Sequence, residues 1–81
     1  MEKGTAVRIV VDKPSGIDRV TRDMLGVIYY VDGCCADIIH IDTTSYWYRL
    51  NHFYQYSAAE EALLTEDIRS RLNYIRREFG L

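Results

Sequence analysis

Hydrophobic and polar positions in the first two thirds of the chain fall into short apolar segments separated by turn residues. Residues 5–11 are rich in β-branched side chains, residues 25–31 form a second apolar segment, and residues 34–41 form a third. Short segments of this composition, bounded by Gly, Asp and Ser, are typical of β-strands. The pattern predicts five antiparallel strands, of which the last two cover residues 46–50 and 53–56.

The segments between these strands carry turn and loop residues. Asp32-Gly33 predicts a tight two-residue hairpin, and residues 42–45 predict a polar turn. Residues 12–24 form a long loop that contains Pro and Gly as chain breakers. Two interpretations of this loop stay open, and we favour the first: it folds back over one end of the sheet, or it is a binding loop.

The last third of the chain changes to helical periodicity. Apolar side chains recur three or four residues apart and form a single stripe on a predicted helix: Leu64, Ile68, Leu72, Ile75 and Phe79. Ser57 and Glu60 have the spacing of a capping box, and Thr65 precedes two acids that suit a helix start. The helix therefore begins near Ala58 or near Glu66. We expect its stripe to pack on the sheet, and the alternative is contact with a second copy of the chain or a partner groove.

Strand register sorts the side chains into two faces. A turn at Asp32-Gly33 pairs Val31 with Cys34 and gives a core face led by these residues: Val27, Tyr29, Ala36, Ile38 and Tyr48. An odd number of residues in the next turn is favoured because an even number would bury Arg49 without a partner.

The opposite, outer face then carries a second set of side chains: Ile28, Tyr30, Cys35, Asp37, Ile39, Trp47 and Arg49. This register also predicts cross-strand pairs of Asp37 with Arg49 and of Ile39 with Trp47. Such a face is too apolar to be fully solvated. We expect the helix, a second copy of the chain or a ligand to cover it.

Length and composition place the chain among small globular domains. Its 81 residues form one domain, with the strands in residues 1–57 and a helix in residues 58–81. Hydrophobic residues make up 48% and the formal net charge is −2, which argues against a strongly electrostatic nucleic-acid binder. The apolar run at the start is too short for a signal peptide, and no segment has the length of a membrane span. Two adjacent cysteines form no disulfide framework, so we expect a reducing cytoplasm.

The chain offers no recognisable catalytic or metal-binding pattern. Cys34, Cys35, His40 and His52 are its only soft metal ligands, and adjacent cysteines on a strand point to opposite faces. No Cys–His pair, carboxylate pair or phosphate-binding glycine loop is evident. We therefore expect a protein that is not an enzyme and uses no metal or cofactor.

The order of elements resembles a known family. A strand and a long loop are followed by GVIYYVDG, another strand, a polar turn and WYRLNHFYQY. This order resembles the SH3-like small β-barrels, including KOW-type and related bacterial and phage domains. Gly26, Val27 and Val31 match the strand after the long loop, and residues 50–56 match the closing turn and strand. The resemblance covers about residues 4–57 and implies a five-stranded antiparallel barrel, with the C-terminal helix outside it.

The KOW type implies contact with nucleic acid or ribosomes through basic loops. The loops of this chain instead mix charges of both signs and contain or adjoin five acids: Asp12, Asp18, Asp23, Asp32 and Asp42. Stacking on nucleic-acid bases uses aromatic side chains but normally adds basic residues nearby. The charge pattern therefore favours a protein partner over nucleic acid.

Aromatic side chains mark the candidate binding site. Tyr, Trp and Arg dominate protein interfaces, and the side chains that the register leaves outside the core are the predicted partner-binding residues: Tyr30, Asp37, Trp47, Arg49, Tyr54 and Tyr56. A homodimer through the outer face or the helix is one form that this contact could take.

Three function classes follow from these features. The favoured class is a small non-enzymatic inhibitor or adaptor that binds a protein, and a phage-encoded inhibitor of a bacterial defence system (anti-CRISPR-like) fits that class. The alternative is a nucleic-acid-binding SH3-like module that regulates transcription or translation. A small-ligand sensor or enzyme is a third class, and it would require a dry aromatic pocket containing Tyr30 and Trp47.

Overall fold

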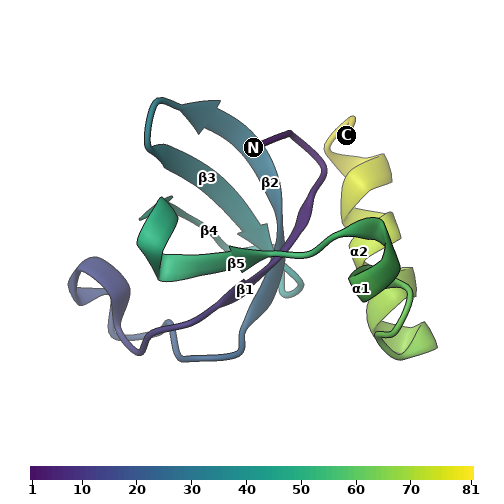
Figure 1. Cartoon of the computed structure of the whole chain (residues 1–81), viewed down its shortest axis with the longest axis horizontal. Coiled ribbons are helices and arrows are strands. Elements are labelled where there is room, and N and C mark those ends of the chain that lie inside the picture. Colours follow the sequence, from purple (N-terminus) through teal and green to yellow (C-terminus); the bar gives the residue numbers. More distant parts are fainter.

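A computed structural model describes all 81 residues and contains one five-stranded sheet followed by two helices (Figure 1). The strands are β1 (Ala6–Ile9), β2 (Leu25–Asp32), β3 (Cys35–His40), β4 (Ser45–Arg49) and β5 (Phe53–Gln55). Two 3₁₀ turns, η1 (Pro14–Gly16) and η2 (Leu50–His52), interrupt the connections, and the helices are α1 (Ala58–Glu61) and α2 (Glu66–Glu78). All strand pairs are antiparallel, in the order β4-β3-β2-β1-β5. The predicted five antiparallel strands and C-terminal helix are confirmed.

The sheet is not closed into the barrel that the sequence predicted. β4 and β5 lie at its two opposite edges, and each pairs with one neighbour only. β5 has three residues, all of which are paired with β1. The other edge of β5 pairs with no strand, so the sheet stays open between β5 and β4.

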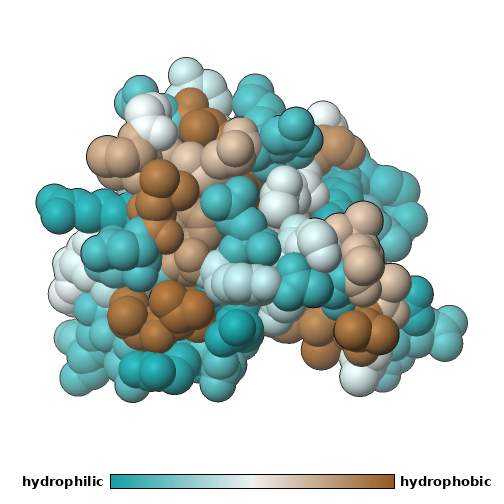
Figure 2. All heavy atoms as spheres, in the orientation of Figure 1, coloured by the Kyte–Doolittle hydropathy of each residue, from teal (hydrophilic) through white to brown (hydrophobic).

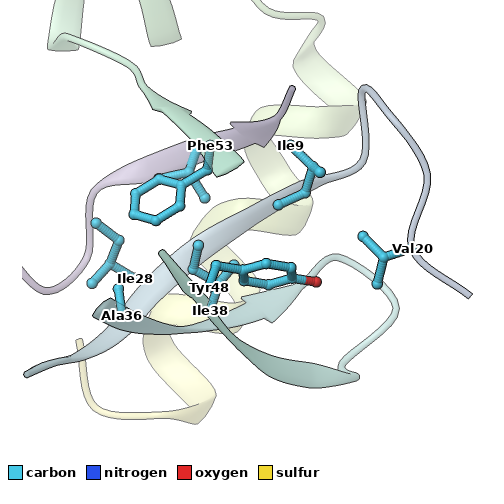
Figure 3. Packing of buried hydrophobic residues seen from close by; sticks show 8 residues of the cluster. Ile9, Val20, Ile28, Ala36, Ile38, Tyr48 and Phe53 are labelled. Atoms are coloured by element: carbon cyan, nitrogen blue, oxygen red, sulfur yellow. The ribbon is translucent and has the colours of Figure 1, made fainter. Parts of the chain in front are cut away.

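The sheet nevertheless curls around a continuous apolar core on one side, which we call the inner face (Figure 3). All five strands and the long loop contribute buried side chains to it: Val7, Ile9, Val20, Ile28, Ala36, Ile38, Tyr48 and Phe53. Burying a side chain of this kind stabilises a fold by roughly 1.5–3 kcal/mol. Eight of the 13 buried hydrophobic residues belong to this cluster, so the inner face supplies most of the core.

The long loop closes one end of this core. Val20 is fully buried and lies beside Ile9 and the Tyr48 ring in Figure 3. Backbone bonds hold the loop back against β1: the Asp23 N–H donates to the Ile9 carbonyl at 2.8 Å, and the Ile9 N–H donates to the Met24 carbonyl at 2.9 Å. The interpretation of residues 12–24 as a loop that folds back over one end is confirmed.

The hairpin between β2 and β3 turns one residue later than predicted. Asp32 pairs with Cys35, so Gly33 and Cys34 form the turn instead of Asp32 and Gly33. Gly33 has φ 58°, a conformation that glycine adopts without steric cost. The need for a positive φ at the first turn position, rather than the Asp-Gly pair itself, fixes the register.

A β-bulge at Tyr29 then changes the faces of β2. Ile28 pairs with Ile38 and Tyr30 with Asp37, so Tyr29 is the extra residue of β2. The predicted faces are correct for β3, for β4 and for the hairpin end of β2. Before the bulge they are reversed, because the extra residue shifts the alternation by one position: Ile28 is in the inner core, and Val27 lies on the outer face.

Helix α2 covers part of the outer face (Figure 1). Leu72 and Ile75 are fully buried against Ala6, Val27 and Ile39. The other predicted stripe residues that pack on this second cluster are Leu64 and Ile68. The expectation that the stripe packs on the sheet is confirmed. Neither helix combines the length and apolar character that crossing a membrane requires.

The two predicted helix starts are both used. Ser57 and Glu60 form a complete capping box at the start of α1, and the Thr65 hydroxyl accepts a hydrogen bond from the Ile68 N–H at the start of α2. Each cap satisfies a backbone N–H that has no partner within the helix. Two separate helices therefore replace the single helix that a start near Ala58 would have given.

Arg76 fastens α2 to the rest of the molecule. Its guanidinium pairs with both carboxylate oxygens of Glu61 at 2.6 and 2.7 Å, and its Nε donates to the Gly4 carbonyl at 2.9 Å. The same side chain donates to Asn73 at 2.9 Å. The guanidinium lowers the pKa of the Glu61 carboxyl below its usual range. Arg76 thus links the N-terminal segment, α1 and α2.

His40 and Tyr48 form a buried polar pair inside the curled sheet. The Tyr48 hydroxyl donates to His40 Nε2 at 2.6 Å, and His40 Nδ1–H donates to the Leu25 carbonyl at 3.2 Å. This arrangement uses both ring nitrogens of a neutral imidazole. Burial lowers the pKa of His40 and raises the pKa of Tyr48.

The first prediction concerns Gly26. A Cβ at this position would lie 2.6 Å from the Ile39 carbonyl oxygen and 2.8 Å from the Ile38 Cγ2. Because the nearest atom belongs to the backbone, Gly26→Ala should lower the free energy of unfolding by about 1–3 kcal/mol. Urea denaturation measures this loss. Ser45→Ala, at an exposed strand position, is the control and should change stability little; equal stability of the two variants would contradict the close approach.

The second prediction concerns pH. The unfolded chain takes up a proton at His40 near pH 6.5, as free histidine does, whereas folded His40 has a lowered pKa and stays neutral. The free energy of unfolding is therefore fully retained above pH 6.5. Below this pH it falls by up to about 1.4 kcal/mol per pH unit, until the pKa of folded His40 is reached. Urea denaturation of the wild type and of His40→Gln at pH 7 and pH 5 isolates this effect. The two proteins should differ in pH slope, and identical slopes would show that His40 is not buried as a neutral ring.

Candidate functional site

Three predicted site residues form one row across the outer face. Tyr30 of β2 pairs with Asp37 of β3, and Asp37 pairs with Trp47 of β4. The Tyr30 and Trp47 rings have centroids 6.1 Å apart and meet edge to face. Each of the two side chains is 49% exposed, so both rings are available to a partner.

Two further aromatic side chains extend this row toward the end of α2. The Tyr29 and Phe79 rings lie edge to face with centroids 6.0 Å apart, and each side chain is 40% exposed. We call Tyr29, Tyr30, Trp47 and Phe79 the aromatic patch. It begins where Leu72 and Ile75 cease to cover the sheet, and it is the part of the outer face that the helix leaves exposed.

Sequence reasoning missed Tyr29 and Phe79. Tyr29 was assigned to the core, and only the bulge brings it to the outer face. Phe79 was assigned to the buried stripe, whose periodicity does continue to this position. The signal that could have found it is Gly80, because a glycine commonly follows the end of a helix and places Phe79 at that end.

Asp37 lies at the centre of the row with no partner in the chain. The three ion pairs of the structure involve other residues, and no donor of the chain hydrogen-bonds its carboxylate. Burial alone raises the pKa of the Asp37 carboxyl above its usual range. A half-buried carboxylate between Tyr30 and Trp47 is costly to keep in an otherwise apolar face.

The predicted Asp37–Arg49 pair does not form. Arg49 pairs in register with Cys35, and Asp37 with Trp47, because β3 and β4 are offset by two residues from the expected register. An offset of two preserves the faces, so Arg49 still lies on the outer face beside Trp47. The odd-length turn is confirmed, whereas the predicted pairs of Asp37 with Arg49 and of Ile39 with Trp47 are wrong.

Tyr54 and Tyr56 lie at the opposite edge of the sheet and are not part of the row. The Tyr56 hydroxyl accepts a hydrogen bond from Arg8 Nε at 3.2 Å, and the Tyr54 hydroxyl donates to the Glu60 carboxylate. The Arg8 guanidinium lies 5.4 Å from the Tyr54 ring centroid, and the Tyr54 hydrogen bond is the main cause of the lowered pKa of Glu60. These contacts satisfy both side chains within the chain, so their positions need no partner to explain them.

The cysteines and histidines do not converge on a metal site. The Cys34 and Cys35 sulfur atoms lie 3.9 Å apart at the hairpin end, so the expectation that they point to opposite faces is wrong; Cys34 belongs to the turn and not to the strand. His40 is buried against Tyr48. No group of three or more His, Cys, Asp or Glu side chains is placed to hold a metal ion.

The hollows of the surface lie away from the row. The most apolar one is a groove between the end of the long loop, the β3–β4 turn and the start of α2, and its lining includes Met24, Ile41 and Ile68. Neither Tyr30 nor Trp47 lines any hollow, so the dry aromatic pocket that a ligand sensor would require is not formed. Figure 2 shows the surface in the orientation of Figure 1. On this side, hydrophobic side chains gather over the sheet and over the helices, with polar side chains between them.

Comparison with protein families, with curated proteins and with solved structures finds no match to this chain. The resemblance to SH3-like barrels therefore stays a prediction from the pattern of the sequence.

The third prediction concerns the isolated carboxylate. Ionised Asp37 destabilises the folded chain because its folded pKa lies above the unfolded value. Asp37→Asn should therefore raise the melting temperature at pH 7, and the difference from the wild type should shrink as the pH falls through the folded pKa and the carboxyl takes up a proton. Calorimetry at pH 7 and pH 4 measures both effects. Glu2→Gln, which changes an exposed acid, is the control; a lower melting temperature of Asp37→Asn at pH 7 would mean that Asp37 has a stabilising partner.

Proposed function

We propose that this chain is a small non-enzymatic module that binds another protein through the aromatic patch. The row of Tyr30, Asp37 and Trp47 is the observation that carries the proposal. Two half-exposed aromatic rings flank a carboxylate that has no partner in the chain. Large aromatic side chains near the centre of a surface patch are the usual energetic anchors of protein interfaces.

The charge of the surface favours a protein partner over nucleic acid. The chain has a net charge of −2, and the patch itself contains Asp37, which would repel a phosphate group. Lys3 and Arg49 border the patch, but two cations do not form the basic stripe that follows a nucleic-acid backbone. A nucleic-acid-binding module that regulates transcription or translation is the alternative function.

Small inhibitors and adaptors of cytoplasmic proteins work by contacts of this kind. A phage-encoded inhibitor of a bacterial defence system, in the manner of anti-CRISPR proteins, is the member of this class that we propose, by analogy of size and composition. Plaque counts of a targeted phage on a CRISPR-protected bacterium that expresses the chain test this narrower proposal. A rise of plaque numbers with the wild type, and none with a variant of the patch, would support it.

The fourth prediction concerns the patch as a whole. The double variant Tyr30→Ser/Trp47→Ser should stay folded, because both side chains are half exposed, and should lose at least about tenfold in affinity for the partner. Affinity capture from bacterial lysate with the wild-type chain would identify a candidate, and titration calorimetry with the purified partner would measure the affinity. Tyr54→Ser, at the other edge of the sheet, is the matched control and should bind as the wild type does.

Three outcomes would contradict the proposal in different ways. Equal affinity of the double variant and the wild type would place the binding site elsewhere. Tight binding of the wild type to RNA or DNA at physiological salt, in a gel-shift assay, would favour the alternative function. Sedimentation that shows a dimer of the wild type and a monomer of the double variant would identify a second copy of the chain as the occupant of the patch.

A further inference from the structure

Three exposed tyrosines of this chain each have a cation near the ring. The Arg8 guanidinium lies 5.4 Å from the Tyr54 ring centroid, and the Arg71 guanidinium lies 4.9 Å from the Tyr74 ring centroid. The Lys3 ammonium lies 5.4 Å from the centroid of the Tyr30 ring. A cation within about 6 Å of an aromatic face is attracted by the ring quadrupole. The chain thus supplies its own cation to three of its aromatic rings.

Trp47, like Tyr29 and Phe79, has no cation of this kind. Indole attracts cations more strongly than phenol does, and Trp47 is 49% exposed, yet no cation of the chain lies over its ring. Its neighbour across the sheet, Asp37, is a carboxylate without an ion-pair partner. The Trp47 ring, which packs on Tyr30 but has no cation, and the unpaired carboxylate are therefore adjacent, and one cation could interact with both.

The two cations that border this position do not fill it. Lys3 contacts the Tyr30 ring, and Arg49 pairs in register with Cys35. Neither forms an ion pair with Asp37. The chain itself therefore places no cation between Asp37 and Trp47.

We propose that the partner protein inserts an arginine side chain between Asp37 and Trp47, where its guanidinium pairs with the carboxylate and stacks on the indole. Arginine fits better than lysine because its planar guanidinium matches a carboxylate with two parallel bonds, stacks on aromatic rings and is more weakly hydrated. This inference rests on the proposed protein-binding function and names the chemistry of its central contact. A phosphate-bearing ligand does not fit, because Asp37 would repel it.

A short peptide tests the contact without knowledge of the partner. Trp47 is the only tryptophan of the chain, so its fluorescence reports on this position alone. The full-length protein is titrated with the capped tripeptide Gly-Arg-Gly and with matched peptides that carry lysine or citrulline, the neutral isostere of arginine. We expect a weak, saturable change with arginine and a weaker one with lysine. Citrulline should bind with at least about tenfold lower affinity, because it lacks the positive charge and replaces one of the two parallel donors by an oxygen.

Two variants make the assay specific. Asp37→Asn keeps the shape of the side chain and removes its charge, and it should lower the affinity for the arginine peptide by at least about tenfold. Arg49→Gln removes a neighbouring like charge and should bind the arginine peptide at least as tightly as the wild type. Circular dichroism and the amide NMR spectrum show that each variant is folded, and shifts of the Asp37 amide and the Trp47 indole signals confirm the place of binding.

Equal binding of the arginine and citrulline peptides, or unchanged binding by Asp37→Asn, would overturn the inference. These failures are distinct from failure of the proposed function. A partner whose affinity depends on Tyr30 and Trp47 but not on Asp37 would leave the patch as the binding site and remove arginine from its centre. Saturable arginine binding that is lost in Asp37→Asn would support the inference by itself.

Discussion

The bulge at Tyr29 is the constraint on which the rest of the structure depends. Because β2 contains one residue more than β3 opposes, the strand presents Ile28 to the inner core and Val27 to the outer face. Both faces of its first half are therefore apolar, and a small curled sheet covers only one of them. The outer side chains, Val27 together with Ala6 and Ile39, would be exposed without α2. The bulge thus decides which side chain of β2 the C-terminal helix covers, Val27 instead of Ile28.

The position of α2 in turn decides which surface stays free. The helix is held by burial of Leu72 and Ile75 and by Arg76, whose guanidinium links it to Glu61 and to the Gly4 carbonyl. It ends at Glu78, before it reaches the row at the hairpin end. The bulge and the helix end together place Tyr29 and Phe79 next to this row, and the exposed patch is the part of the outer face that has no cover within the chain.

The sequence predicted much of this arrangement because most of it follows from alternation and periodicity. The faces of β3 and β4, the helical stripe, the capping residues and the loop that covers the core all come from local patterns. The bulge does not, because no residue type at position 29 demands it; it arises when the Gly33 turn and the two-sided packing of β2 must be satisfied together. Alternation alone predicts that Tyr30, Asp37 and Trp47 share the outer face. The bulge explains why the prediction for Tyr29 is wrong, and the two-residue offset between β3 and β4 explains why the predicted partner of Asp37 is wrong.

The proposed binding role of the patch rests on Asp37, which has no partner within the chain. A carboxylate between Tyr30 and Trp47 raises the free energy of the folded chain, and an asparagine would occupy the same volume without the charge. Polar side chains at the other edge of the sheet do have partners within the chain. Arg8 hydrogen-bonds Tyr56, and Glu60 accepts a hydrogen bond from Tyr54. Asp37 has no such contact, so the free chain gains nothing from its charge. We propose that a cation that arrives with another molecule offsets the cost of burying this carboxylate.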